Sequence, residues 1–115
     1  MPLFNDLIAT SPVERAVIAG CDASGRLYDF VAVSDYNTLI VGNITKAVSR
    51  VLAHPRVEFL IMAHNHPCGT PTPSSIDIDV TKRMAAFVRL GGGVLVDHLL
   101  YADAQPQSFR ALGLL

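Results

Sequence analysis

The sequence has little charge and no long apolar run, and each shortage excludes a class of protein. Charged residues make up 17% of the 115 residues, and the formal net charge is −1. The nine Lys and Arg are scattered from Arg15 to Arg110, so no basic stripe indicates a nucleic-acid or anionic-membrane surface. No apolar stretch reaches the roughly 18 residues that span a bilayer, and no basic leader precedes an apolar segment at the N-terminus. We therefore expect a cytoplasmic protein that contacts neither a membrane nor, directly, nucleic acid.

Repeats, low-complexity tracts and charge blocks are also missing, and cysteine is scarce. In a chain without a secretion signal, we expect the two cysteines, Cys21 and Cys68, to be reduced thiols and not a disulfide. Half of the residues are apolar, which suffices for one core, whereas 115 residues leave no room for a second domain. The sequence therefore predicts a single domain over residues 1–115.

Hydrophobic periodicity and turn residues predict a mixed α/β domain. Two short strands, 13–20 and 26–33, flank the turn sequence 22–25 (DASG) and should pair antiparallel. A helix is expected from an N-cap at Asn43 to a stop at Pro55, and a buried strand over 57–63 follows it. The next predicted helix opens at Ser74 and ends at the glycines 91–93. Its apolar stripe consists of Ile76, Val80, Met84, Phe87 and Val88. A last strand is predicted over 94–101.

Two of the four histidines, His64 and His66, stand where the strand 57–63 runs into a loop. In extended backbone, residues i and i+2 point to the same side with Cα atoms roughly 6 to 7 Å apart, so both imidazoles can bind one ion. Asp77 falls in the first turn of the next predicted helix, and the ten intervening residues are enough to bring its carboxylate back to the histidines. Two imidazoles and one carboxylate leave the fourth position of a zinc ion open, which is typical of catalytic zinc. Ligands without thiolates also suit iron or manganese, so zinc is a preference among three ions.

A hydrolytic site also needs a general base, and the sequence offers only two glutamates. Glu58 lies six residues before His64 on the same strand, roughly 20 Å away at about 3.3 Å per residue, so it cannot be the base. By elimination we expect Glu14 to take this role, with Asp97 as the alternative. The Ser74 hydroxyl is a candidate hydrogen-bond donor to the oxyanion of a tetrahedral intermediate.

The string HNHPCGTPTPSSID resembles the JAMM metal-binding signature, in which His-x-His-Pro precedes a short loop and Ser-x-x-Asp, with a glutamate upstream. The Asn between the histidines and the Gly-x-Pro-x-Pro-Ser loop are similar to the RadC-like branch of this family. VERAVIAGCDASGRL resembles the first hairpin of the branch, LVDHLL its late strand and SFRALGLL its C-terminal end. The resemblance therefore covers nearly all of the chain after residue 12.

This resemblance implies a JAB/MPN-like domain of the cytidine-deaminase-like fold, with a mixed β-sheet flanked by helices. It implies His64, His66 and Asp77 as ligands of one zinc ion per chain, Glu14 as the general acid and base, and Ser74 as the oxyanion-stabilising hydroxyl. RadC-like proteins commonly carry an N-terminal helix-hairpin-helix region, which we do not expect within residues 1–115.

Several of these residues also have simpler interpretations. Ser74 and Asp77 match a capping box, which alone would explain both side chains. Asp97 and His98 are either a pair behind the metal ligands or polar residues at a strand edge. Cys68 stands where the RadC-like branch usually has Ser, so a thiol ligand is a further alternative.

The expected function is that of a zinc-dependent hydrolase of the metallopeptidase or isopeptidase class, in which metal-activated water attacks an amide carbonyl of a peptide or protein substrate. One alternative is a non-catalytic JAB-fold binding or scaffolding module, and another is a DNA-repair-associated RadC-like protein. The full ligand set favours the enzyme over the scaffold, while the near-neutral charge argues against direct contact with DNA. No pattern in the sequence indicates an oligomeric state.

Overall fold

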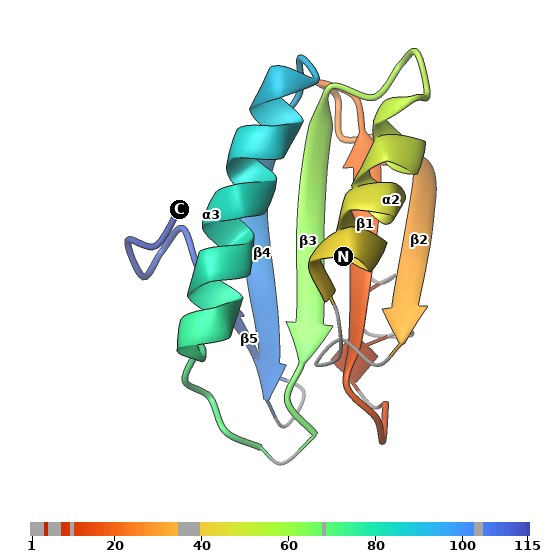
Figure 1. Cartoon of the computed structure of the whole chain (residues 1–115). Helices are drawn as coiled ribbons and strands as arrows, with labels where there is room; N and C mark the ends of the chain where they lie inside the picture. The colour runs from red at the N-terminus through yellow and green to blue at the C-terminus, as the bar shows by residue number, and fades with distance from the viewer. Residues whose placement is uncertain (1–3, 5–7, 10, 35–39, 68, 103–104) are drawn as a thin grey trace.

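Five strands and two helices make up the part of the chain that the computed structural model describes, which is residues 4, 8–9, 11–34, 40–67, 69–102 and 105–115. The elements follow in the order β1 (Arg15–Cys21), β2 (Leu27–Ser34), α2 (Ile40–Leu52), β3 (Phe59–Asn65), α3 (Ser75–Leu90), β4 (Val94–Ala102) and β5 (Gln105–Ser108) (Figure 1). Among the described residues, no helix combines the length and the apolarity needed to cross a bilayer.

The strands form one mixed sheet in the order β2-β1-β3-β4-β5. β1 pairs antiparallel with both β2 and β3, β4 pairs antiparallel with β5, and β3 runs parallel to β4. The parallel pair requires a crossover, which α3 provides. The predicted class, a single α/β domain with a mixed sheet and helices, is confirmed, and the predicted apolar strand is β3 at the centre of the sheet.

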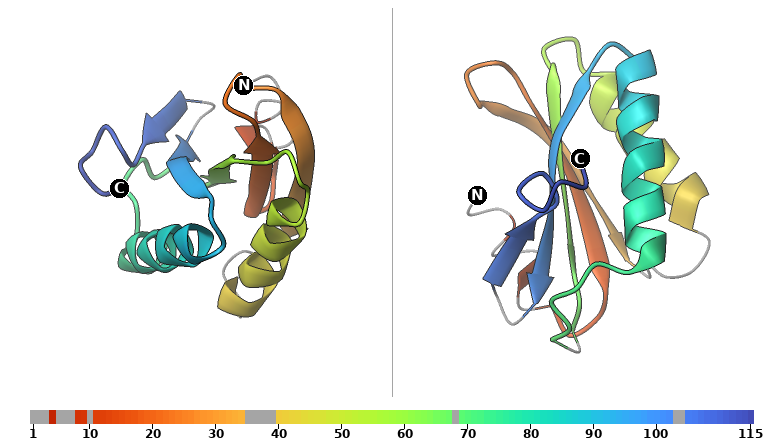
Figure 2. Two further views of the ribbon diagram at one scale, coloured as in Figure 1. Left: turned by 90° about the horizontal axis from the view of Figure 1, so that it is seen from above. Right: turned by 90° about the vertical axis from the view of Figure 1, so that its left-hand side faces the viewer.

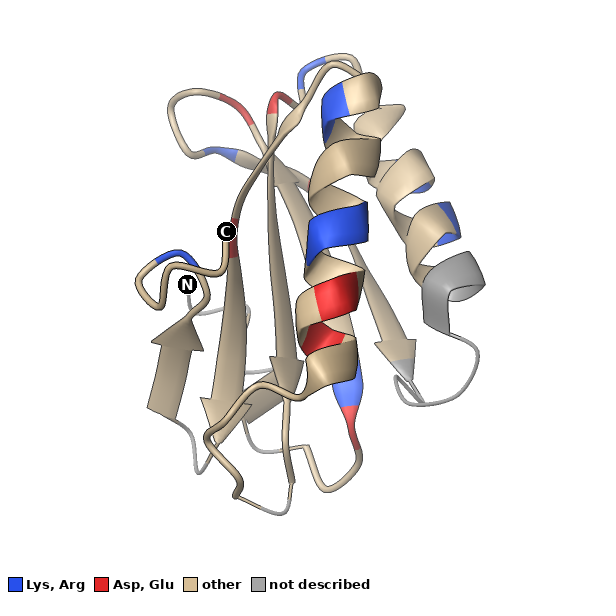
Figure 3. Ribbon diagram, turned by 60° about the vertical axis from the view of Figure 1, so that its left-hand side comes forward, with Lys and Arg blue, Asp and Glu red and all other residues tan. Residues whose placement is uncertain are grey.

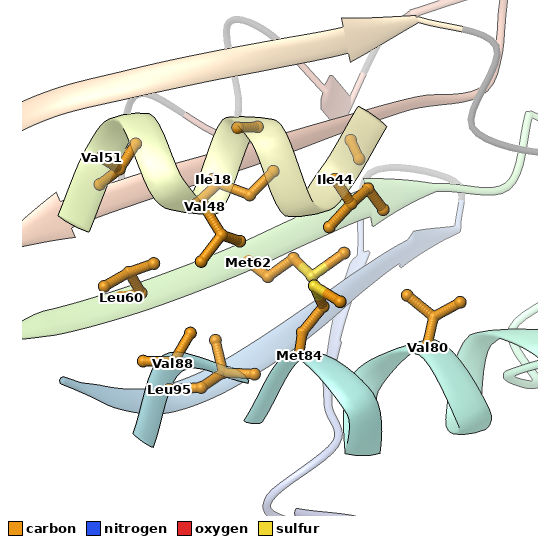
Figure 4. Packing of buried hydrophobic residues seen from close by; sticks show 12 residues of the cluster. Ile18, Ile44, Val48, Val51, Leu60, Met62, Val80, Met84, Val88 and Leu95 are labelled. Carbon is orange, nitrogen blue, oxygen red and sulfur yellow. The ribbon is translucent and has the colours of Figure 1, made fainter. Parts of the chain in front are cut away.

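Both helices pack on the same face of the sheet (Figure 2). α2 covers β1 and β2, and α3 covers β4 (Figure 1). Figure 4 shows how side chains from the two helices and the sheet meet in one apolar layer. Its labelled members are Ile18, Ile44, Val48, Val51, Leu60, Met62, Val80, Met84, Val88 and Leu95.

The opposite face of the sheet carries a second, smaller cluster. Val17 and Ala19 alternate along β1 with the residues that face the helices, as the pleat of a strand requires. They pack with Ala63, Tyr101 and two residues near the N-terminus, Phe4 and Ile8, and all six side chains are buried. β1 and β3 are therefore apolar on both sides, which explains their continuous hydrophobic sequences.

Two local predictions were wrong. α2 begins at Ile40 and contains Asn43, so Asn43 is not the N-cap. Asn costs only part of a kcal/mol inside a helix, so its capping preference does not force a start. Ile76 is 61% exposed and lies outside the apolar stripe of α3. Two polar residues, Asp77 and Thr81, take the inward-facing places near the start of this helix instead.

Charge along α3 follows the helix dipole. Its acidic residues, Asp77 and Asp79, lie in the first turns and its basic residues lie further along, as Figure 3 shows. Negative charge near the N-terminus of a helix and positive charge near its C-terminus are each stabilising. Asp79 also forms an ion pair with Arg83 one turn on, at 2.9 Å, although both side chains are exposed. The helix dipole and this exposed ion pair do not explain why Asp77 and Thr81 are buried. Both side chains contact histidines instead.

Candidate metal centre

β3 ends, β1 begins and α3 opens at the same end of the sheet (Figures 1 and 2), and the predicted ligands meet there. His64 is the penultimate residue of β3 and is fully buried, and His66 follows the strand with 12% of its side chain exposed. Asp77 lies in the first turn of α3, and Glu14 directly precedes β1. Each of these four residues offers a ligand atom, and the four atoms lie within 4.8 Å of one another.

The distances within the group suit a tetrahedral ion. His64 Nε2 lies 3.2 Å from His66 Nε2. The carboxylate of Asp77 presents Oδ1 to His64 Nε2 at 3.3 Å and Oδ2 to His66 Nε2 at 3.1 Å. A tetrahedral zinc site with metal–ligand bonds of about 2.0 Å places neighbouring ligand atoms about 3.3 Å apart. Glu14 Oε1 is further out, at 3.9 Å from His66 Nε2. The three pairwise distances therefore suit residues that share one ion, with Glu14 further out.

The hydrogen bond of His66 leaves its other ring nitrogen suited to bind a metal ion. His66 Nδ1 lies 2.9 Å from the carbonyl oxygen of Thr70, which can only accept, so Nδ1 carries the proton. In the neutral ring Nε2 then has a bare lone pair, and it faces an oxygen of Asp77 at 3.1 Å. Two acceptors attract at this distance only with a proton or a metal ion between them. The donor set fits a metal ion such as zinc.

Asp77 combines the two roles that the sequence left open. As the third residue of α3 it completes a capping box: its Oδ2 accepts the Ser74 N–H at 2.8 Å, and the Ser74 hydroxyl accepts the Asp77 N–H at 3.0 Å. Burial would raise the pKa of Asp77, but its neighbour His64 and the hydrogen bonds of Ser74 hold it below its ordinary value. The cap thus orients an ionised carboxylate toward the histidines.

Asn65, the residue between the histidines, holds the segment that carries Glu14. Its Oδ1 accepts the Arg15 N–H at 2.7 Å, and its Nδ2 donates to the carbonyl oxygens of Ser11 at 3.1 Å and Val13 at 3.0 Å. Asn65 is 2% exposed. A single amide therefore binds the backbone on both sides of Glu14, and only a side chain with both a donor and an acceptor can do so.

His98 lies directly behind His64, which decides one of the open alternatives. Its Nε2 is 2.6 Å from His64 Nδ1, its Nδ1 is 2.6 Å from the Thr81 hydroxyl, and its ring stacks on Phe109. Burial lowers the pKa of His98 well below its ordinary value. The neighbouring Asp97 instead accepts hydrogen bonds from the Ser108 hydroxyl and the Arg110 N–H. Only His98 of this pair supports the site.

Of the remaining candidates, Ser74 lies beside this group. Ser74 is the N-cap of α3, and its hydroxyl remains a predicted oxyanion donor. Glu58 accepts the N–H of Ala23 in the β1–β2 turn, at the other end of the sheet from the histidines. Cys68 lies outside the described residues, and Cys21 is a buried thiol.

Sequence reasoning missed Thr81 and the role of Asn65. The available signal for Thr81 was its spacing, because it stands four residues after Asp77, on the same side of the helix. Asn65 carried no local signal, since its partners are 50 to 54 residues away in the chain.

Comparison with known proteins places the chain in a family. The family model described as "RadC-like JAB domain" matches residues 1–114. A UPF0758 protein of Aquifex aeolicus is 35% identical over 102 residues, which cover 89% of this chain and 44% of that protein. A UPF0758 protein of Methanospirillum hungatei is 34% identical over 109 residues, covering 82% and 48%, and one of Geobacillus thermodenitrificans is 38% identical over 86 residues, covering 66% and 36%. The chain thus spans less than half the length of these relatives.

Proposed function

The chain belongs to the RadC-like JAB domain family, and on this basis we propose that it is a zinc-dependent hydrolase of the metallopeptidase or isopeptidase class. One observation carries the proposal: two histidines, an aspartate and a glutamate converge within 4.8 Å at the end of the central strand. His64, His66 and Asp77 would hold one zinc ion per chain. Zinc, when bound, makes water a stronger acid and polarises a carbonyl group.

Glu14 is the proposed general base and acid. Its Oε1 lies 3.9 Å from His66 Nε2, further out than the three proposed ligands. At this distance it could accept a proton from a water molecule held between Glu14 and the ligands. In hydrolysis of an amide, Oε1 takes the proton of the attacking water and passes it to the nitrogen of the leaving amine. Asn65 serves this step by fixing the backbone on either side of Glu14.

Ser74 is the proposed oxyanion donor. Its oxygen already accepts the Asp77 N–H, and a hydroxyl that accepts one hydrogen bond can still donate its own proton. Ser74 is exposed whereas Asp77 is buried, so the cap lies between solvent and the ligand group. The Ser74 hydroxyl could then donate a hydrogen bond to the oxygen of a substrate carbonyl as the carbonyl carbon becomes tetrahedral.

The first test is the zinc content of protein purified without a metal-binding tag. We expect about one zinc ion per chain in the wild type and none in His66→Ala, because that variant removes one of three ligands. His54→Ala is the matched control, since His54 lies just beyond α2, against Tyr28 and away from the site. No zinc in the wild type, even after zinc is added, would refute the metal site and favour the non-catalytic scaffold.

The second test separates binding from catalysis with a library of fluorogenic peptide and isopeptide substrates. Glu14→Gln should retain zinc but lose at least about 100-fold in turnover, the contribution typical of a general acid–base residue. The other glutamate of the chain supplies the control, because Glu58→Gln changes the same group at the far end of the sheet. Equal turnover of Glu14→Gln and wild type would remove Glu14 from the mechanism.

The location and the partners of the protein stay predictions from the sequence. They comprise a cytoplasmic location, a peptide or protein substrate, and no direct contact with a membrane or with nucleic acid. Salt-sensitive binding of DNA fragments would contradict the last of these.

A further inference from the structure

A chain of three buried hydrogen bonds runs from His64 back to the backbone of Asp77. His64 Nδ1 lies 2.6 Å from His98 Nε2, and His98 Nδ1 lies 2.6 Å from the Thr81 hydroxyl. The Thr81 hydroxyl is 2.7 Å from the carbonyl oxygen of Asp77. His64, His98 and Thr81 are all fully buried, so no bulk water competes for these groups. The chain starts and ends on candidate metal ligands.

The direction of the protons follows from the last bond of this chain. A carbonyl oxygen can only accept, so the Thr81 proton points at Asp77. If Thr81 donated to His98 instead, two oxygen atoms would face each other at 2.7 Å with no hydrogen between them. The Thr81 oxygen therefore accepts from His98, and His98 Nδ1 carries a proton.

The same logic continues to His64. Full burial favours the neutral ring of His98, because an imidazolium loses its hydration there. A neutral His98 with its proton on Nδ1 has a bare Nε2, which accepts from His64 Nδ1. The proton of His64 is thereby kept on Nδ1, and the lone pair of its Nε2 is left facing His66 and Asp77.

We propose that His98 and Thr81 are positioning residues that fix His64 in the tautomer able to bind a metal ion through Nε2. The proposal deepens the proposed function and rests on it for the identity of the ion. Ligating histidines usually donate their other ring N–H to a fixed partner, and loss of that partner typically costs about 10- to 100-fold in metal affinity. Here the partner is a neutral histidine, whose tautomer is set by a threonine on the helix that supplies Asp77.

Ring nitrogen NMR of uniformly ¹⁵N-labelled protein tests the proton positions. Two-bond ¹H–¹⁵N spectra distinguish a protonated ring nitrogen from a bare one, and His54, outside the site, provides an internal reference. We expect His98 to carry its proton on Nδ1 in the metal-free and the zinc-loaded protein. A wild-type His98 protonated on Nε2, or on both nitrogens, would overturn the proposal.

Thr81 offers a matched pair of variants. Thr81→Val keeps the shape of the side chain but removes the acceptor, so the His98 proton should move to Nε2 and turn the His64 lone pair away from the site. Zinc affinity, measured by competition with a chelator, should then fall about 10- to 100-fold. Thr81→Ser keeps the hydroxyl and should retain both the wild-type tautomer and an affinity close to that of the wild type.

The outcomes separate this inference from the proposed function. Wild-type tautomer and zinc affinity in Thr81→Val would overturn the inference while leaving the zinc site in place. A wild type that binds no zinc would overturn the proposed function, and the spectrum of the metal-free protein would still decide the tautomer. Should Thr81→Val fail to fold, the wild-type spectrum and Thr81→Ser still test the proposal.

Discussion

Replacement of Asn65 by alanine tests whether the residue between the histidines holds the Glu14 segment. The change removes three hydrogen bonds, with Arg15 N–H, the Ser11 carbonyl and the Val13 carbonyl. Each such bond contributes about 1 kcal/mol net, so we expect a loss of about 3 kcal/mol in the free energy of unfolding. For a domain of this size that loss corresponds to a fall of about 10 °C in Tm.

The assay is urea unfolding of the metal-free protein, followed by circular dichroism. Gln105→Ala, an exposed position on β5, is the control and should change stability by less than about 0.5 kcal/mol. Asn65→Asp is the sharper comparison, because it keeps the acceptor for Arg15 N–H but turns a carboxylate oxygen toward two carbonyls. At neutral pH it should destabilise at least as much as alanine.

Amide hydrogen exchange localises the effect. The Arg15 N–H should lose its protection in Asn65→Ala, whereas Val17, buried further along β1, should change only as much as global stability does. A loss below about 1 kcal/mol, with Arg15 still protected, would refute the reasoning. It would mean that water replaces the amide and that Asn65 does not fix the Glu14 segment.

Two further predictions concern the metal-free protein. Burial lowers the pKa of His98 in the folded state. As the pH falls below about 6.5, the His98 ring therefore takes up a proton in the unfolded chain only. The free energy of unfolding should then fall by up to about 1.4 kcal/mol per pH unit. Urea unfolding from about pH 7 to pH 5 should show a shallower slope for His98→Gln; equal slopes would contradict a neutral His98. Gly20→Ala should destabilise by about 1–3 kcal/mol, since its Cβ would overlap Val51 Cγ1 of α2. An unchanged Tm would show that β1 and α2 move apart without loss of stability.

The sequence by itself determined the elements and the ligand types. Alternation and turn residues predicted the β1–β2 hairpin, and the apolar run before His64 predicted the central strand, because these patterns depend on neighbours in the chain. The spacing of His64, His66 and Asp77 indicated a metal site for the same reason: a strand end and a helix start bring them together locally. The errors at Asn43 and Ile76 arose where weak local preferences gave way to packing.

Only the tertiary structure decided what surrounds those ligands. Glu14 reaches the site because β1 pairs with β3 in a register that places Ala16 opposite His64, and no local pattern specifies that register. Asn65 and His98 acquire their roles through partners 17 to 54 residues away. Hydrogen bonds over such distances depend on how strands and helices pack, so the sequence named the candidate metal ligands while the fold placed the groups that orient them.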